Sequence, residues 1–383
     1  MSGSNPVLQA AAAPFGEAQS LPFEIYHNPD WLAAEQAHVF TGEWVMACTA
    51  EQVANPGDCF ALQVANEPVL VIRDDEGHLQ AFANICRHRG TLLVDEGPGH
   101  IDKYITCPYH AWAYARNGEL KAVPYSNDIA VDRNQHALTP FVAEEWCGLI
   151  FVNLDAQAPS LAQRLAQAAP YLEKFAPQTY TRHTAVQTEH WNANWKLAME
   201  NAMESYHLFK VHEQTLEVFS PTRDAYYLAG STEWSLTGGA TQRQKGVFER
   251  LFGGASEEWM EHYLLILLPP TFVAVLSYGS LGWFNVQPVD ATHSIIRSGA
   301  VAHADMPKGD KASEDFTAAF FAEDKFICER VQRGMTSNAS RGGQLVDMER
   351  IVVDFHRFWA NRLGAGQPTE VFADPEQSPR WLT

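Results

Sequence analysis

The chain has 383 residues, with 27 Lys and Arg against 46 Asp and Glu, and its formal net charge at pH 7 is −19. This charge argues against nucleic acid and anionic membranes as partners, because both are themselves negatively charged. Hydrophobic residues make up 46% of the chain and charged residues 19%, which indicates a globular protein of about two domains rather than a disordered one.

Cysteine usage and the lack of long apolar segments predict a cytoplasmic protein. The six cysteines are spread over a long chain and do not resemble a disulfide framework. No run of about 18 apolar residues is present, so we expect no transmembrane helix. The first twenty residues have no basic segment and no sustained apolar core, and we interpret them as a flexible arm rather than a signal peptide.

The first two parts of the chain have different patterns. Residues 1–42 are predicted to form this arm and one helix that packs with the C-terminal domain, with Asn28 or Asp30 as the helix cap. Residues 43–156 alternate short β-prone runs with turns such as Asn117-Gly118, which is typical of a small all-β domain.

Residues 157–383 are predicted to form a larger domain, in which strand-like runs between about 225 and 302 make one antiparallel sheet. Its other predicted elements are a strand at 183–191, helices at 160–176, 194–212, 311–334 (ending at Gly334) and 346–363, and an irregular tail at 364–383. The predicted fold class is therefore α+β: a small all-β domain followed by a domain with an antiparallel sheet flanked by helices.

Two short motifs in the all-β domain carry metal-ligand chemistry. Cys86 and His88 form a C-x-H pair, and Cys107 and His110 form a C-x2-H pair eighteen residues later. Thiolate and imidazole ligands suit a structural zinc ion or an iron–sulfur cluster. A single residue between two ligands is shorter than the usual zinc-knuckle spacing. A Rieske [2Fe–2S] centre takes one Cys and one His from each of two loops, and the all-β context favours it.

A second constellation lies on the segment Asn194–His212. Its apolar residues recur at helical spacing, and Glu200, Glu204 and His207 are expected to share one helical face. His207 and His212 are five residues apart, or about 140° around an ideal helix, so both reach one ion only if the helix ends or distorts near 208–211. Two imidazoles and one carboxylate would form the facial triad of non-haem Fe(II). The alternative is two unrelated histidines on an amphipathic helix.

Together, the motifs CRHRG, CPYH and NWKLAMENAMESYHLFKVH resemble the large subunit of Rieske non-haem iron oxygenases, over about residues 25–360. The resemblance implies a [2Fe–2S] cluster held by Cys86, His88, Cys107 and His110. It also implies a mononuclear Fe(II) held by His207, His212 and Asp324, with Asp324 preferred over its neighbour Glu323.

The resemblance also implies how the two centres communicate. Glu204 matches the family's bridging carboxylate, which would join His110 of one protomer to His207 of the next in a head-to-tail homotrimer. Asn201 is a tentative candidate for a supporting residue near the iron, and the role of Glu200 is left open. The implied partners are a separate NAD(P)H-dependent flavin and iron–sulfur reductase, O2 and a small-molecule substrate.

Two substrate classes are considered. Glu204 and the pattern E-D-x3-C-E-x2-Q-x-G at residues 323–334 resemble oxygenases of quaternary ammonium compounds such as choline, betaine and carnitine. This resemblance implies hydroxylation and N-demethylation of a methylated amine. The alternative is the large subunit of an aromatic-ring hydroxylating dioxygenase, many of which have Asp at the bridging position.

Overall fold

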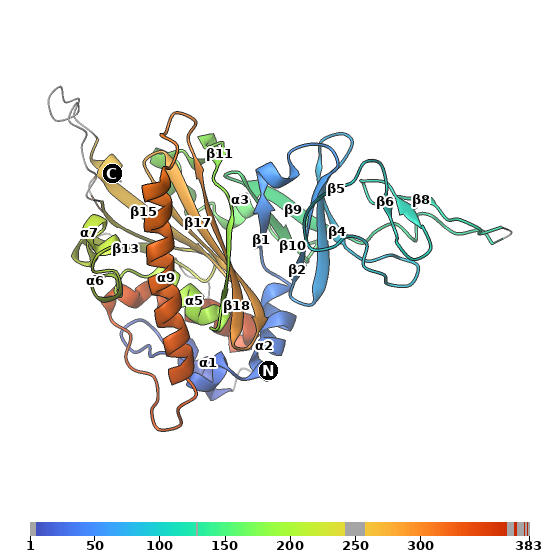
Figure 1. Cartoon of the computed structure of the whole chain (residues 1–383). Helices are drawn as coiled ribbons and strands as arrows, with labels where there is room; N and C mark the ends of the chain where they lie inside the picture. Colours follow the sequence, from blue (N-terminus) through green and yellow to red (C-terminus); the bar gives the residue numbers. More distant parts are fainter. Residues whose placement is uncertain are drawn as a thin grey trace. The chain divides into compact units, whose positions relative to one another are not determined.

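A computed structural model describes residues 5–127, 129–241, 257–365, 371–373, 379 and 381. The chain forms two compact units (Figure 1). Residues 36–161 form one unit, and the segments 1–35 and 162–383 come together in the other. None of the helices in the described parts of the chain is long and apolar enough to span a bilayer.

The smaller unit contains a seven-stranded sheet with the order β1-β10-β9-β4-β3-β2-β5, in which every neighbouring pair is antiparallel. Its strands are β1 (Val45–Thr49), β2 (Asp58–Val64), β3 (Glu67–Arg73), β4 (Leu79–Ala83), β5 (Gly97–His100), β9 (Pro140–Trp146) and β10 (Leu149–Asn153). The unit also holds the short helices η2 (Gln36–Phe40) and η3 (Ala50–Val53). The all-β prediction is confirmed, although β5 and β9 have weak strand signals and were not predicted.

A second, three-stranded sheet in this unit consists of β6 (Ile105–Thr106), β7 (Ala113–Tyr114) and β8 (Leu120–Ala122). Buried Ile105, Tyr114 and Leu120 pack with Cys86 and Cys107 in one apolar cluster. Gly118, in the predicted turn, has φ +85°, and a Cβ there would lie 2.6 Å from the Phe82 ring. The turn therefore requires glycine both for its backbone angle and for space.

The larger unit is built on one antiparallel sheet, as predicted, and this sheet has nine strands because β11, β12 and β19 join the strands between 225 and 302. The order is β11-β18-β17-β16-β15-β14-β13-β19, and β12 also pairs with β18. The strands are β11 (Arg182–His183), β12 (Gln187–Trp191), β13 (Ala225–Gly230), β14 (Ser235–Ala240), β15 (His262–Leu268), β16 (Phe272–Ser277), β17 (Ser280–Asp290), β18 (His293–Ala302) and β19 (Phe372–Ala373).

Three helices position the functional residues of this unit. Helix α5 (Trp195–Met203) packs against β15, β16 and β17, and α10 (Arg350–Ala360) packs against β13, β14 and α5. The long helix α9 (Lys311–Gly334) contacts α5 and is the most prominent helix in Figure 1. The remaining short helices are α1 (Pro6–Ala11), η1 (Phe23–Tyr26), α2 (Pro29–Glu35), α3 (Leu161–Arg164), α4 (Ala169–Leu172), η4 (Glu173–Phe175), η5 (Pro177–Thr179), α6 (Leu208–Val211), α7 (Leu216–Phe219), η6 (Thr222–Asp224), η7 (Glu258–Glu261), η8 (Asp347–Glu349) and η9 (Asn361–Ala365).

The terminal segments differ from the prediction. The N-terminal arm is not a flexible segment throughout, because α1 packs on α10 and buries Leu8 completely. In the tail, β19 pairs with β13. Residues 366–370, 374–378, 380 and 382–383 of the predicted tail lie outside the described residues.

The predicted helix at 160–176 is also wrong. The chain forms α3, then turns, then forms α4 and η4. Pro170 lies in the first turn of α4. Because proline has no N–H to donate to the preceding turn, it favours the start of a new helix over the continuation of an existing one.

A fully buried ion pair ties the N-terminal segment to the core of the larger unit. Lys196 Nζ of α5 lies 2.6 Å from Glu35 Oε1 of α2, and both side chains are 0% exposed. The indole N–H groups of Trp195 and Trp359 each donate to the same carboxylate at 2.7 Å. A buried carboxylate with three donors is satisfied, whereas one that has lost its cation is left with an uncompensated charge.

Lys196→Met is therefore expected to lower the free energy of unfolding by about 3–5 kcal/mol, because it leaves the Glu35 charge buried without a cation. Urea denaturation measures this change. Asp315→Ala, which removes an exposed pair with Lys311, is the matched control and should leave the midpoint close to that of the wild type. Equal midpoints for the two variants would contradict the assigned role of the buried pair.

Candidate iron–sulfur and iron centres

The two cysteine–histidine loops share one backbone hydrogen-bond pattern. In the first, Cys86 N donates to Thr91 O at 2.8 Å and Gly90 N donates to Cys86 O at 2.9 Å. In the second, Cys107 N donates to Trp112 O at 2.8 Å and Ala111 N donates to Cys107 O at 3.0 Å. Gly90 and Ala111 occupy matching positions and both have positive φ, +73° and +55°. The two loops are thus similar turns, each presenting one thiol.

The thiols lie inside the fold and the imidazoles lie at its surface. Cys86 and Cys107 are 3% and 2% exposed, whereas His88 and His110 are exposed. The two imidazole rings lie 4.9 Å apart. The ring of Trp112 stacks on His88 at 4.8 Å, and Tyr109 contacts His110 at 3.7 Å. The loops therefore bring together all four residues that the sequence singled out.

Polar groups around the thiols determine how easily each ionises. Burial opposes ionisation of the Cys107 thiol, but the backbone N–H groups of Tyr109 and His110 outweigh it and lower the pKa of Cys107. Burial is the main cause of the raised pKa of Cys86, whose sulfur lies 3.3 Å from the Tyr114 hydroxyl. Backbone N–H groups directed at sulfur stabilise thiolate, which is the form that binds iron.

The second constellation depends on where α5 ends. Asn194 caps its N-terminus by accepting a hydrogen bond from Lys196 N at 2.9 Å. The helix stops after Met203, and Glu204 has extended backbone angles. The sequence spacing predicts that Glu204 and His207 continue the helical face of Glu200. This prediction is wrong, because both residues lie beyond the end of α5. The break occurs earlier than the expected region, 208–211.

Glu204 shapes the turn that follows α5. Its carboxylate accepts hydrogen bonds from the backbone N–H groups of Tyr206 and His207, the latter at 3.2 Å. Its other oxygen lies 2.5 Å from His207 Nδ1. One side chain therefore caps the turn and fixes the direction of the His207 ring.

His207, His212 and Asp324 each direct a possible ligand atom at a common region, and these atoms all lie within 4.8 Å of one another. Asp324 Oδ1 lies 2.9 Å from His212 Nε2 and 3.5 Å from His207 Nε2. His207 comes from the turn before α6, His212 from the end of α6 and Asp324 from α9. The side chains of His212 and Asp324 are 0% and 13% exposed.

Opposite charges dominate the electrostatics of this triad. Burial opposes protonation of His207, but its contacts with Asp324 and Glu204 outweigh burial and raise the pKa of His207 to about 10. Burial likewise opposes protonation of His212, whose pKa is nevertheless raised, chiefly by Asp324. Burial would raise the pKa of Asp324, but the two imidazoles lower it. The carboxylate is therefore ionised at neutral pH.

Glu323 has a role that the sequence did not indicate. The sequence presented it only as a competitor of Asp324, but Glu323 Oε2 lies 2.7 Å from His212 Nδ1. Thr215 donates to the same oxygen at 2.7 Å. Each histidine thus has a carboxylate at Nδ1, Glu204 or Glu323, and directs Nε2 toward Asp324. Carboxylates in this position orient histidine ligands and fix their tautomer.

The pattern E-D-x3-C-E-x2-Q has a structural explanation. Asp324, Cys328 and Gln332 follow a spacing of four along α9 and lie on one face. Cys328 Sγ contacts Leu197 O at 3.8 Å, and Gln332 Oε1 accepts from Asn194 N at 2.7 Å. Glu329 accepts from the backbone and side-chain N–H groups of Asn192, both at 3.0 Å. These contacts pin α9 along α5 and thereby position Asp324.

Two further residues near the break differ in their surroundings. Glu200, whose role the sequence left open, accepts from Tyr26 Oη at 2.8 Å and contacts His356 Nε2 at 3.0 Å. It links η1, α5 and α10, which no sequence spacing indicated. Asn201 is partly buried, and its side chain makes no hydrogen bond to the described residues. Its supporting role near the iron stays a prediction.

Comparison with known proteins supplies the family. Residues 43–133 match the model of the Rieske [2Fe-2S] domain, and residues 177–365 match that of the ring hydroxylating alpha subunit (catalytic domain). The chain belongs to the Rieske non-haem iron oxygenase family. Its two domains are those that carry a Rieske [2Fe–2S] cluster and a mononuclear iron.

Two relatives illustrate the similarity in sequence. The carnitine monooxygenase oxygenase subunit of Escherichia coli (strain K12) is 27% identical over 331 residues, which cover 85% of this chain and 87% of that protein. The glycine betaine monooxygenase oxygenase subunit of Chromohalobacter salexigens is 32% identical over 197 residues, which cover 51% of this chain and 44% of that protein.

Solved structures confirm the fold. A quaternary ammonium Rieske monooxygenase studied for carnitine oxidation and inter-subunit electron transfer matches with a TM-score of 0.79 and 21% identity, covering 93% of this chain and 97% of that one. Naphthalene 1,2-dioxygenase from Rhodococcus sp. matches with a TM-score of 0.77 and 19% identity, covering 96% and 100%. The α+β fold is therefore shared by enzymes whose names indicate different substrates.

The residues present fit both metal groups. Two buried thiols and two surface imidazoles on paired turns provide the two-Cys, two-His donor set of a Rieske cluster. Two imidazoles and one ionised carboxylate, with Nδ1 of each ring held by a further carboxylate, provide the donor set of a non-haem ferrous ion. When bound, the cluster supplies single electrons and the ferrous ion supplies the position where O2 is activated.

Glu323→Gln is expected to weaken Fe(II) binding about 10- to 100-fold, because the amide holds His212 less firmly in the ligand orientation. Iron retention during dialysis against a chelator measures the change, and the visible spectrum of the cluster reports that the other centre is intact. Glu314, which is exposed in the first turn of the same helix, gives a control in Glu314→Gln. Unchanged iron retention in Glu323→Gln would contradict the role of Glu323.

Proposed function

We propose that the chain is the oxygenase component of a multicomponent enzyme that hydroxylates and N-demethylates a small quaternary ammonium or methylated amine substrate. The observation that carries this proposal is the triad of His207, His212 and Asp324 behind its two supporting carboxylates. Two relatives are named as oxygenase subunits of carnitine monooxygenase and glycine betaine monooxygenase, and these names support the proposed substrate class. The proposed ligands of the cluster are Cys86, His88, Cys107 and His110. The proposed ligands of the mononuclear iron are His207, His212 and Asp324.

The charge around the triad favours a cationic substrate. The carboxylates of Glu204, Glu323 and Asp324 contact the imidazoles, and together they outnumber the two positive charges of a ferrous ion. Within the described part of the chain, the ion-pair partners of these carboxylates are histidines. The buried cation of α5, Lys196, is already paired with Glu35. A negative site attracts a methylammonium group and repels a substrate with only negative charge.

The protein residues supply orientation and charge to the reaction. Glu204 and Glu323 keep the Nδ1–H tautomer of both rings, which leaves each Nε2 lone pair available as a ligand. The reaction consumes O2, two electrons and two protons, and converts a substrate C–H bond to C–OH with release of water. Hydroxylation of an N-methyl carbon gives a hemiaminal, which collapses to formaldehyde and the demethylated amine.

Partners follow from the same proposal. Electrons come from NAD(P)H through a separate flavin and iron–sulfur reductase, and the chain works as a head-to-tail homotrimer in the cytoplasm. Glu204 carries electrons from His110 of one protomer to His207 of the next. The contact between Glu204 and His207 at 2.5 Å supplies one half of this bridge within a single chain. The similar monooxygenase studied for inter-subunit electron transfer supports the arrangement.

The proposal predicts substrate-dependent O2 uptake with a methylammonium compound, in an assay with NADH, a suitable reductase and the purified, metal-loaded protein. The panel contains choline, glycine betaine and carnitine beside benzoate, salicylate and phenols, and formaldehyde is measured in parallel. Formaldehyde equimolar with the O2 consumed supports the N-demethylase. O2 uptake with an arene alone would instead support the second candidate function, aromatic-ring hydroxylation. This candidate is tested because naphthalene 1,2-dioxygenase has the same fold.

Two variants separate iron binding from electron transfer. Asp324→Ala should lose mononuclear iron and all turnover but keep the electron paramagnetic resonance signal of the reduced cluster. Glu204→Gln should keep enough iron to be reloaded, yet slow oxidation of the reduced cluster in single-turnover experiments by about 10- to 100-fold, the range for losing a carboxylate that supports a ligand histidine. Normal oxidation of the cluster in Glu204→Gln would remove Glu204 from the proposed route.

A further inference from the structure

A cavity of about 280 Å³ lies beside the turn between α5 and α6, and the mechanism above does not use it. Its wall includes Ser205, which stands between Glu204 and His207 in the chain. Consecutive Cα atoms are 3.8 Å apart, so the Cα atoms of Ser205 and His207 are separated by at most about 7.6 Å. One wall of the cavity is therefore formed by the same turn that carries His207, a proposed iron ligand. The cavity volume lies just below the range typical of sites for drug-sized molecules, so the cavity suits a smaller ligand.

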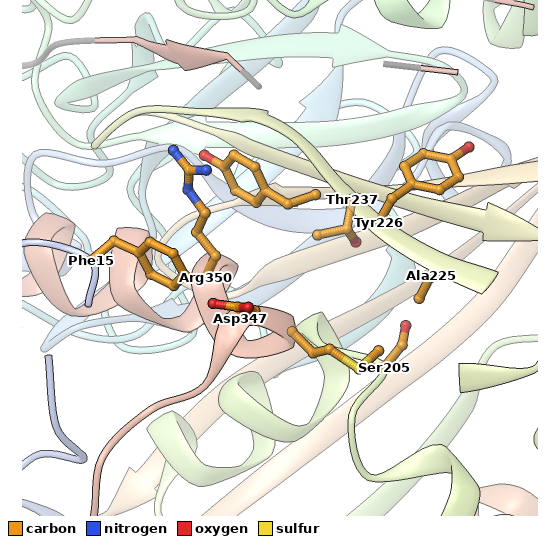
Figure 2. A pocket seen from close by; sticks show the side chains of 9 residues that line it. Phe15, Ser205, Ala225, Tyr226, Thr237, Asp347 and Arg350 are labelled. Atoms are coloured by element: carbon orange, nitrogen blue, oxygen red, sulfur yellow. The ribbon is translucent and has the colours of Figure 1, made fainter. Parts of the chain in front are cut away.

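The lining of the cavity carries both charges among aromatic rings. Arg350 and Asp347 contribute a guanidinium and a carboxylate, and Phe15, Tyr226 and Tyr227 contribute aromatic side chains. The Arg350 guanidinium lies over the Tyr227 ring at 4.3 Å and over the Phe15 ring at 5.1 Å. Figure 2 shows this guanidinium and Ser205 at opposite sides of the cavity. The ring contacts fix the position of the cation.

A buried hydroxyl in the wall also lacks a protein partner. Thr237 of β14 is 8% exposed, and its Oγ1 makes no hydrogen bond to the described residues. A buried polar atom without a partner costs free energy, so this hydroxyl calls for a ligand or water oxygen. A guanidinium has five N–H donors and can hold a carboxylate while keeping other contacts.

We propose that the cavity is the subsite for the carboxylate of a zwitterionic substrate, with Arg350 binding the carboxylate and Thr237 donating to it. The methylammonium end then points past Ser205 toward the acidic triad. This inference rests on the proposed function and narrows it to betaine-type compounds, which carry both charges. Choline has the same ammonium group without the carboxylate and gains nothing from Arg350.

Equilibrium binding tests the proposal without turnover. Calorimetry on the anaerobic holoenzyme compares glycine betaine, choline and benzoate for the wild type, Arg350→Met, Arg350→Lys and Thr237→Val. Arg350→Met should weaken betaine binding about 10- to 100-fold, the range for a lost hydrogen bond to a charged group, and change choline binding less than about 3-fold. Arg350→Lys should recover part of the loss, and Thr237→Val should weaken betaine binding about 3- to 10-fold. Arg223→Met removes an exposed arginine as control.

The outcomes are distinct. Selective loss of betaine binding in Arg350→Met or in Thr237→Val supports the subsite. Equal effects on betaine and choline in both variants, or none in either, overturn it and leave the proposed function standing. A wild-type enzyme that binds neither compound overturns the inference, and the proposed function falls with it only if carnitine also gives no O2 uptake in the turnover assay. Binding of benzoate that depends on Arg350, without binding of betaine, assigns the cavity to an anionic arene and overturns the zwitterion.

Discussion

The termination of α5 at Glu204 is the constraint on which the iron site depends. A continuous helix would place His207 and His212 on different sides of one cylinder. Instead, the carboxylate of Glu204 accepts the N–H groups of the next turn and the Nδ1–H of His207. The broken helix allows His207 and His212, at the two ends of α6, to face one point. The same Glu204 side chain therefore caps the turn and orients the His207 ring.

Asp324, the proposed third ligand, reaches this point because α9 is held along α5. Gln332 and Glu329 accept hydrogen bonds from the backbone just before α5, and Gln332 also donates to Tyr26 O at 3.0 Å. Asp324 lies two helical turns before Gln332 on the same face. A motif that resembled a marker of substrate class thus has an architectural role: it sets where the carboxylate of Asp324 lies relative to the two histidines.

Sequence reasoning succeeded where chemistry is local. Paired Cys and His on short loops, and hydrophobic periodicity in β15 to β18, predicted the cluster loops and the antiparallel sheet. It failed where a contact between residues far apart in the sequence determines the role of a side chain. Sequence spacing does not reveal the partners of Glu323 and Glu200, because His212 and His356 lie 111 and 156 residues away from them. The prediction of one helix at 160–176 is wrong because Pro170 favours the start of a new helix, and this preference outweighs the apolar pattern.

The buried pair of Glu35 and Lys196 has a consequence for how the chain folds during synthesis. The two residues are 161 positions apart, and the whole of the smaller unit lies between them. At about 5–20 residues per second, a ribosome needs roughly 10–30 s to travel that distance. All residues of the smaller unit are synthesised during this interval, while residues 5–35 wait for α5, and these residues wait about twice as long for α10, because Trp359 lies 324 positions after Glu35. The smaller unit is thus an insertion in the larger unit, whose N-terminal segment is synthesised first and whose packing is completed last.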